Sequence, residues 1–195
     1  RRPRIGVVAV QGAFAEHAAM LDALGEPHFE LRCHEDMERP FDRLILPGGE
    51  STVQGRLLRD EDMLEPLRKR IEAGMPVLGT CAGLILLASR IIDAGANDRT
   101  IRPETHLGTL DVTVERNAYG RQLASFATTE SFEGIGTVSM RFIRAPRIIE
   151  TGDDVIELAH IDGTIVAVRQ GSQIATAFHP ELDDDTHIHE LFCGL

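Results

Sequence analysis

Pro76-Val77-Leu78-Gly79 is a short apolar run that leads directly into Thr80-Cys81-Ala82-Gly83, and a second apolar run continues to Ile92. The first run is typical of a buried parallel strand, and the second is apolar enough for a buried helix. We therefore expect a strand over residues 76–79 and a helix from Gly83 to Ile92. A tight turn carrying Cys81 joins the two.

Strands and helices alternate in the same way through about the first half of the chain. Apolar runs predict strands at residues 5–10, 28–32 and 44–46, and helical spacing predicts helices at 14–24 and 63–73. Gly25 and Gly74 are expected to end these two helices, and Ser51 or Thr52 to cap a further one. This alternation favours an α/β fold with an open, mostly parallel sheet flanked by helices.

The second half has a different pattern. Residues 93–106 are polar and predict a surface loop. Segments at 109–115, 122–128, 138–143 and 164–168 alternate, which indicates extra antiparallel strands. Asp183 to Thr186 offer caps for a short last helix that reaches Leu191. No repeat or linker interrupts the chain, so residues 1–195 are expected to form one domain around one core.

Composition excludes several classes of function. The formal net charge of −11 repels nucleic-acid phosphates, and no apolar run approaches the roughly 20 residues that span a bilayer. The three cysteines, Cys33, Cys81 and Cys193, form neither a disulfide framework nor a zinc-binding spacing. They suit a reducing compartment, so we expect a cytoplasmic protein without partners among nucleic acids or membranes.

The strongest chemical signal is Cys81 between Gly79 and Gly83. A nucleophile between small residues, after a strand and before a helix, is typical of a nucleophile elbow. Such a turn exposes the thiol at a helix N-terminus, where the thiolate is favoured, and directs the N–H of Ala82 toward a developing oxyanion. The alternative is an inert cysteine buried in a glycine-rich turn.

A thiolate enzyme also needs a base that a third group orients. His179 follows an apolar strand-like run, Pro180 stiffens the turn, and Glu181 stands two residues on. The alternative is a surface turn in which His179 and Glu181 are exposed and have no catalytic role. His187 and His189 lie on an acidic helix and are expected to be solvated. Apart from acidic neighbours of His34 and His160, the remaining histidines lack a nearby orienting carboxylate at a strand end: His17, His28, His34, His106 and His160.

Pro47-Gly48-Gly49-Glu50-Ser51 follows the predicted strand at residues 44–46. Two glycines let the backbone approach a ligand closely and can supply a second oxyanion N–H. An ordinary turn into a helix capped by Ser51 would have the same sequence. The turn, Cys81 and His179 all fall at predicted carboxyl ends of strands, where ligands of open α/β sheets bind.

Taken together, these segments resemble the triad (class I) glutamine amidotransferases, which combine an elbow cysteine, a late His-x-Glu and a Pro-Gly-Gly-type loop. Nearly the whole chain is similar to the glutaminase subunits of pyridoxal 5′-phosphate synthase, the PdxT/SNO family. The stretches that carry this resemblance are Val10 to His17, Leu46 to Thr52, Gly79 to Leu84, Val114 to Asn117, Phe142 to Pro146, and Phe178 to Leu182.

The resemblance implies a flavodoxin-like fold and hydrolysis of L-glutamine to glutamate and ammonia by Cys81, His179 and Glu181. It places Gly49 and Ala82 at the oxyanion. The glutamine-binding positions that it implies are Gly49, Glu50, Ser51, Arg116, Ile143 and Arg144. It also puts Gln11-Gly12 near the oxyanion region. No metal or organic cofactor is implied. The implied partner is a barrel-shaped synthase subunit in a large hetero-oligomer, without which the glutaminase is poorly active.

Three alternatives stay open at this point. The same reaction could serve another pathway, such as histidine or nucleotide synthesis, although the segments around Arg116 and Arg144 argue against it. A cysteine hydrolase of the DJ-1 or intracellular-protease type would place its histidine directly after Cys81, where this chain has Ala82. A non-catalytic module with an inert Cys81 is the third.

Overall fold

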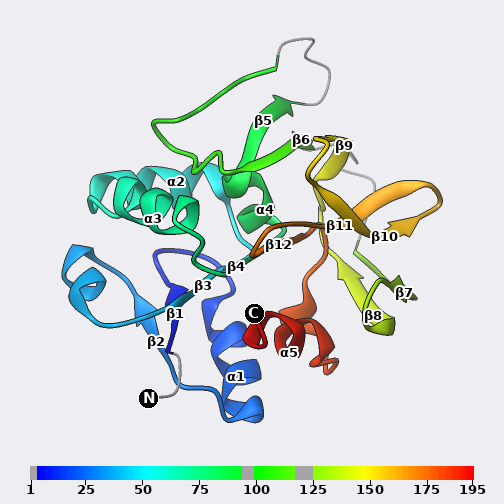
Figure 1. The fold of residues 1–195 in the computed structure, drawn as a ribbon, viewed down its shortest axis with the longest axis horizontal. Helices are drawn as coiled ribbons and strands as arrows, with labels where there is room; N and C mark the ends of the chain where they lie inside the picture. The colour runs from blue at the N-terminus through cyan, green and yellow to red at the C-terminus, as the bar shows by residue number, and fades with distance from the viewer. Residues whose placement is uncertain (1–3, 94–98, 117–124) are drawn as a thin grey trace.

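A long mixed sheet with helices on both faces organises the molecule (Figure 1). The structure is a computed structural model that describes residues 4–93, 99–116 and 125–195. Its first half contains β1 (Ile5–Val8), α1 (Phe14–Leu24), β2 (His28–Leu31), η1 (His34–Glu38), β3 (Arg43–Leu46), α2 (Ser51–Asp60), α3 (Leu64–Glu72), β4 (Val77–Thr80), α4 (Ala82–Leu87) and β5 (Ala88–Asp93). Its second half contains β6 (Leu110–Arg116), β7 (Phe126–Phe132), β8 (Gly136–Phe142), β9 (Arg147–Thr151), β10 (Ile156–Ile161), β11 (Thr164–Gln170), β12 (Gln173–Thr176), η3 (Pro180–Leu182) and α5 (His187–Cys193).

The strand order of the large sheet is β2-β1-β3-β4-β12-β11-β9-β6-β5, with β10 beside β11. From β2 to β12 all neighbours run parallel. The next neighbours, as far as β6, run antiparallel, and β5 joins β6 in parallel. Strands β7 and β8 form a separate antiparallel pair. The predicted α/β fold, with extra antiparallel strands in the second half, is therefore confirmed.

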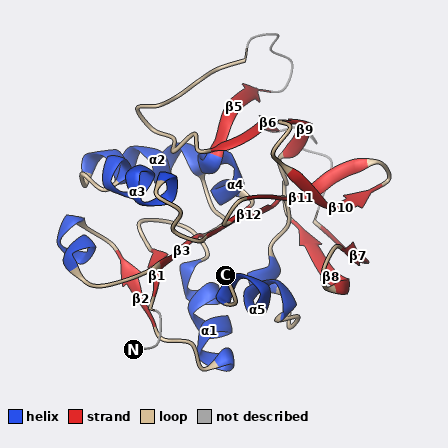
Figure 2. Ribbon diagram, viewed as in Figure 1, coloured by secondary structure: helices blue, strands red, loops and turns tan. Residues whose placement is uncertain are grey.

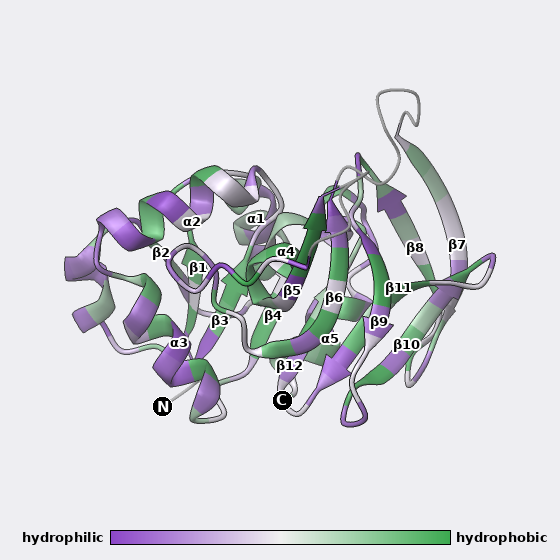
Figure 3. Cartoon of the chain, turned by 90° about the horizontal axis from the view of Figure 1, so that it is seen from above, coloured by the Kyte–Doolittle hydropathy of each residue, from purple (hydrophilic) through white to green (hydrophobic). Residues whose placement is uncertain are grey.

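The central parallel strands β1 and β4 are buried along their whole length because both of their faces are covered. Every residue of β1 and β4 is buried. Figure 2 shows α1 and α5 on one side of these strands and α2, α3 and α4 on the other. In Figure 3 the apolar stretches gather in the central strands, while the outer surfaces of α2 and α3 are largely hydrophilic.

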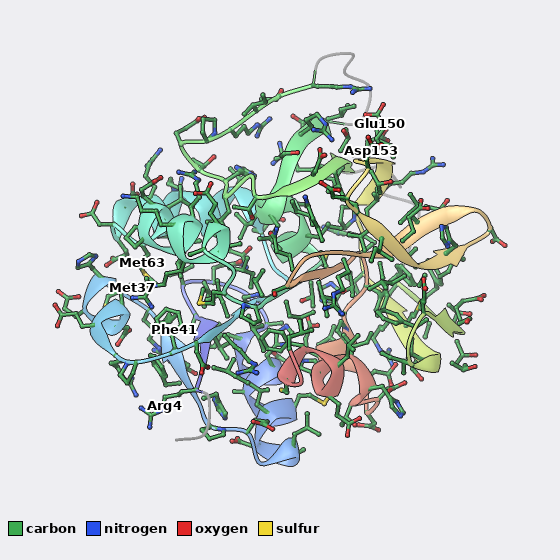
Figure 4. The ribbon with its side chains drawn as sticks, viewed as in Figure 1. Arg4, Met37, Phe41, Met63, Glu150 and Asp153 are labelled. Carbon is green, nitrogen blue, oxygen red and sulfur yellow. The ribbon has the colours of Figure 1, made fainter. Side chains whose placement is uncertain are left out.

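Side chains fill the space between the sheet and these layers (Figure 4). Met37 and Met63 are buried, and Figure 4 labels them with Phe41 on the side of the molecule that holds η1. The guanidinium of Arg70 lies 4.3 Å from the ring centre of Phe41 and donates to the carbonyl of Met37 at 3.0 Å. These contacts pack η1 and the segment before β3 against α3.

The predicted helix over residues 83–92 is wrong in its second half. Helix α4 ends at Leu87, and the chain continues as β5, in which Ile91 stands opposite Val114 of β6. A buried strand and a buried helix give the same continuous apolar run. The partner strand begins about twenty residues later in the chain, so local periodicity did not reveal it.

One predicted helix cap and one predicted helix end need correction. Helix α2 begins at Ser51 itself, with Glu50 at its N-cap, and no side-chain cap bond forms there among the described residues. The last helix runs on to Cys193 and does not end at Leu191, and Asp185, one of the four expected caps, accepts the N–H of His187 at 3.0 Å. Helix α1 ends as predicted, with Gly25 in the left-handed region at φ 68°.

The predicted surface loop at residues 93–106 is confirmed only in part. Asp93 still belongs to β5, Thr100 pairs with Ile91, and His106 is buried. Residues 94–98 of this loop, Asn117 of the family-like segment and residues 122–124 of a predicted strand lie outside the described residues. No helix in the described part of the chain is long and apolar enough to cross a membrane.

Candidate active site

Cys81 occupies a strained turn between β4 and α4. Its backbone has φ 51° and ψ −99°, a region that a residue with a side chain adopts only when its surroundings enforce it. The surroundings are close-packed: a Cβ at Gly83 would overlap the carbonyl oxygen of Leu46, and one at Gly79 would lie 2.7 Å from Leu87. The two small flanking residues are therefore required, and the nucleophile elbow predicted from them is present.

His179 and Glu181 form a buried pair at the end of β12. Nδ1 of His179 donates to Oε1 of Glu181 at 2.7 Å, and both side chains are less than a tenth exposed. Burial lowers the pKa of His179, but hydrogen bonds with Cys81 and Glu181 outweigh it and raise the pKa to about 10. Since Nδ1 is engaged with the carboxylate, Nε2 is the nitrogen left for the thiol.

The glycines after β3 serve a close approach. A Cβ at Gly48 would overlap Cε1 of His179 and lie 2.6 Å from its Nδ1. Gly49 has φ 156°, and a Cβ there would overlap Oε1 of Gln11. Gly48 thus makes room for the imidazole of His179, and Gly49 makes room for the neighbouring loop. This is a more specific requirement than the ordinary turn that the sequence also allowed.

A cavity of about 360 Å³ lies over Cys81. Its lining includes Cys81, His179 and all six positions expected to bind glutamine: Gly49, Glu50, Ser51, Arg116, Ile143 and Arg144. Ala82, the other residue expected at the oxyanion, is buried at the first position of α4, directly after Cys81. The structure therefore brings together residues from five separate segments of the chain.

One carboxylate that the sequence analysis missed holds Arg116 at this cavity. Asp93 accepts from Nε of Arg116 at 2.8 Å, and Thr52 accepts from its Nη1 at 3.0 Å. Burial raises the pKa of Asp93, but Arg116 and Arg102 lower it by more, so this carboxylate stays ionised. Asp93 is aligned with Arg116 in the register of β5 and β6, and only strand pairing reveals this.

Thr52, Ile85 and Pro146 also line the cavity and were not predicted. A partial signal existed for two of them, because Thr52 directly follows Ser51 and Pro146 belongs to the segment that carries Arg144. Ile85 follows Cys81 by four residues, so a helix after the elbow would have placed it on the same face.

Gln54 ties the loops around the cavity together. It is fully buried, and its Nε2 donates to the carbonyls of Gln11 and Pro47, both at 3.1 Å. The N–H of Glu50 donates to Oε1 of Gln11 at 2.9 Å. Gln11 therefore lies against the glycine loop, as the family resemblance implied. A polar residue on the inner face of a predicted helix was the missed signal for Gln54.

Two of the histidines set aside in the sequence analysis lie close to this site. His189 is fully buried, so the expectation that it is solvated is wrong, whereas His187 is exposed as expected. His17 is also fully buried, and its Nε2 lies 3.5 Å from Oε2 of Glu181. The packing of α1 and α5 under the sheet covers both rings, which the acidic composition of α5 did not suggest. Within the described residues, no group of three or more His, Cys, Asp or Glu side chains could hold a metal ion.

A cysteine at the end of a central parallel strand, with a histidine and a carboxylate at the end of its neighbour, is the arrangement of a class of proteins, the class I glutamine amidotransferases. The chain belongs to the SNO glutamine amidotransferase family, whose model matches residues 7–194.

Comparison with known proteins agrees with this assignment. The chain is 52% identical over 192 residues to a protein of Streptococcus pneumoniae (strain CGSP14) named pyridoxal 5′-phosphate synthase subunit PdxT, covering 97% of this chain and 95% of the relative. A protein of Desulfitobacterium hafniense with the same name is 54% identical over 189 residues, covering 97% and 91%. A crystal structure described as a glutamine amidotransferase superposes with a TM-score of 0.87 at 42% identity, covering 98% and 99%.

Proposed function

We propose that this chain is the glutaminase subunit of a pyridoxal 5′-phosphate synthase, hydrolysing L-glutamine to L-glutamate and ammonia. The observation that carries the proposal is the single cavity lined by Cys81, His179 and Arg116. It offers a nucleophile, a base and a cation to one small substrate. The names of the two relatives, each about half identical over nearly the whole chain, support the pathway.

Glutamine is held by its amino-acid end at the outer part of the cavity. An arginine suits the substrate carboxylate because its guanidinium can donate two parallel hydrogen bonds. Arg116 is fixed for this task by Asp93 and Thr52, and Arg144 lines the same cavity. Gly49, Glu50, Ser51 and Ile143 complete the contact surface, and the side-chain amide points at Cys81.

The reaction begins when His179 takes the proton of the Cys81 thiol. The thiolate attacks the amide carbon, and the N–H groups of Gly49 and Ala82 stabilise the oxyanion. His179 returns the proton to the departing ammonia, which leaves a thioester on Cys81. Water, activated by His179, then hydrolyses the thioester to glutamate. Glu181 keeps the imidazole in the tautomer that has Nε2 facing the thiol.

The ammonia passes to a synthase subunit. Free ammonia is mostly protonated in neutral water and is then no nucleophile, so a protected path to the acceptor is chemically required. We propose a barrel-shaped synthase subunit as partner in a large hetero-oligomer. A cytoplasmic location agrees with the three cysteines, all of which are described and are free thiols.

The test is glutamate release from glutamine, with and without the synthase subunit of a pyridoxal 5′-phosphate synthase. Four proteins are compared: the unaltered chain, Cys81→Ala, and the matched controls Cys33→Ala and Cys193→Ala. We expect activity that rises with the synthase subunit, survives both control changes and is lost in Cys81→Ala. Activity that does not change when the synthase subunit is added would contradict the proposed role in pyridoxal 5′-phosphate synthesis. Activity retained by Cys81→Ala would contradict the mechanism.

A further inference from the structure

Two buried histidines lie behind the carboxylate of Glu181. His17 comes from α1 and His189 from α5, and neither ring has any solvent exposure. Nδ1 of His17 lies 2.8 Å from Nε2 of His189, and Nε2 of His17 lies 3.2 Å from Oγ1 of Thr80. The same Nε2 lies 3.5 Å from Oε2 of Glu181. The mechanism proposed above uses neither histidine.

The positions of the protons follow from burial. Burial lowers the pKa of His17, and it lowers the pKa of His189 to about 3, so both rings are neutral near pH 7 and each carries one N–H. A lone pair of His17 facing a carboxylate would be repelled, so its N–H is on Nε2. Its Nδ1 therefore accepts from Nε2–H of His189.

The hydroxyl of Thr80 extends this series of hydrogen bonds toward Glu181. It accepts from Nε2–H of His17 at 3.2 Å and donates to Oε1 of Glu181 at 3.4 Å. Three residues, His189 of α5, His17 of α1 and Thr80 of β4, thus form a series of hydrogen bonds. In each bond the proton points toward the carboxylate. An ionised carboxylate can only accept hydrogen bonds, so a series of hydrogen bonds that ends on it must have this orientation.

The carboxylate needs this support because it is almost completely buried. Glu181 is 5% exposed, and no described residue donates a hydrogen bond of ordinary geometry to its Oε2. Removing a carboxylate from water without donors is costly. Burial raises the pKa of Glu181, and the hydrogen bond from His179 is among the contacts that oppose this and leave the pKa lowered. Nε2 of His17 lies 3.5 Å from Oε2, so its N–H is placed to face this oxygen.

We propose that His17 is a positioning residue of the glutaminase, a neutral Nε2–H donor that keeps the Glu181 carboxylate ionised and turned toward His179. His189 fixes the tautomer of His17 by donating to its Nδ1. His17 acts only through Glu181 and His179 and does not touch the substrate. The inference rests on the proposed catalytic roles of Cys81, His179 and Glu181.

Few other charges face this carboxylate. His179 and Cys81 lie on its catalytic side, and Asp183 and Asp184 border with it a small hollow beside α1. Glu16 is exposed on α1 next to His17. The acidic neighbours raise the proton affinity of the carboxylate, so they act against ionisation. His17 and His179 are therefore the groups that act in favour of it.

Three substitutions at one position separate hydrogen bonding from packing. His17→Gln places an amide N–H where Nε2–H was, His17→Asn keeps only a group facing His189, and His17→Leu keeps neither. His160→Gln is the matched control, because His160 lies on β10 with its side chain 46% exposed. Glutamine hydrolysis is measured against pH in the complex with the synthase subunit, beside the unaltered chain and Cys81→Ala.

We expect His17→Leu and His17→Asn to lower kcat about tenfold with KM within about twofold of the unaltered chain. Without the N–H donor the pKa of Glu181 rises, so the acidic limb of the kcat profile moves about one pH unit upward. His17→Gln should recover most of kcat and the original limb. Equal loss in all three variants, or an unmoved limb, would show that the ring only fills space.

A measurement on the unaltered protein covers the case in which the variants do not fold. The ¹⁵N shifts of the His17 ring distinguish its tautomers and its protonated form. A neutral ring with the proton on Nε2 from pH 6 to 9 supports the proposal, whereas a proton on Nδ1 or a ring that titrates in this range overturns it. Activity that persists in Cys81→Ala would instead refute the proposed catalytic mechanism itself.

Discussion

Gly48→Ala tests how tightly the imidazole of His179 is held. Gly48 does not have a positive φ, so alanine suits its backbone, and the added methyl group is the whole perturbation. That methyl would overlap Cε1 of His179 and lie 2.6 Å from its Nδ1, with Oε1 of Glu181 at 3.2 Å. The perturbation therefore acts on the base and its carboxylate and leaves Cys81 untouched.

The expected loss of activity follows from the required displacement. Restoring an ordinary contact distance moves the ring by roughly 1 Å, and a misplacement of this size costs about 100-fold in rate. This corresponds to about 2.7 kcal/mol of lost transition-state stabilisation. Because the added methyl group would meet His179 and Glu181 and no residue expected to bind glutamine, KM for glutamine should change by less than about threefold.

The assay is steady-state glutamate release in the complex with the synthase subunit, with thermal unfolding as a check of folding. Gly194→Ala is the matched control. Gly194 has φ −84°, and a Cβ there would meet the carbonyls of Leu191 and Glu190 at 3.5 and 3.6 Å, which is ordinary contact. A folded Gly48→Ala protein with kcat within threefold of the unaltered chain would refute the argument.

Two further predictions concern a cation and a buried histidine. Arg116→Met should raise KM for glutamine about ten- to 100-fold with a smaller change in kcat, since a charged hydrogen bond is worth about 1.5–3 kcal/mol; an unchanged KM, as expected for exposed Arg56→Met, would contradict its role. Burial, then Arg116 and Arg102, lower the pKa of His106 to about 4, so this histidine is neutral in the folded protein. Its contribution to the stability of the fold is therefore complete above pH 6.5 and is lost as the pH falls toward 4. In urea unfolding, the free energy of unfolding should fall by about 2 kcal/mol less between pH 7 and pH 5 in His106→Gln than in the unaltered chain. An equal fall in both proteins would refute this.

The local geometry around Cys81 and His179 could be predicted because a short segment carries the evidence for each. The elbow at Cys81 needs small neighbours, and Gly79 and Gly83 stand beside it in the sequence. His179 and Glu181 are two residues apart, so their hydrogen bond is a local property of one turn. The expected glutamine-binding positions came from a family resemblance, and the structure places them around one cavity.

The prediction failed where a residue owes its surroundings to a distant part of the chain. The helix predicted to reach Ile92 ends at Leu87 because β6 pairs with the residues that follow. His189 is 172 residues from its partner His17, and Asp93 is 23 residues from Arg116. Charge and periodicity within a segment contain no record of these contacts.

The amino-acid sequence by itself determined the alternation of strands and helices, the strained turn at Cys81 and the pairing of His179 with Glu181. Each depends on residues within a few positions of one another, where sterics and hydrogen bonding act locally. Only the tertiary structure decided which strands are neighbours, and with that the cavity over Cys81 and the burial of His17 behind Glu181. These depend on apolar burial, which has no direction and is settled only when the whole chain packs.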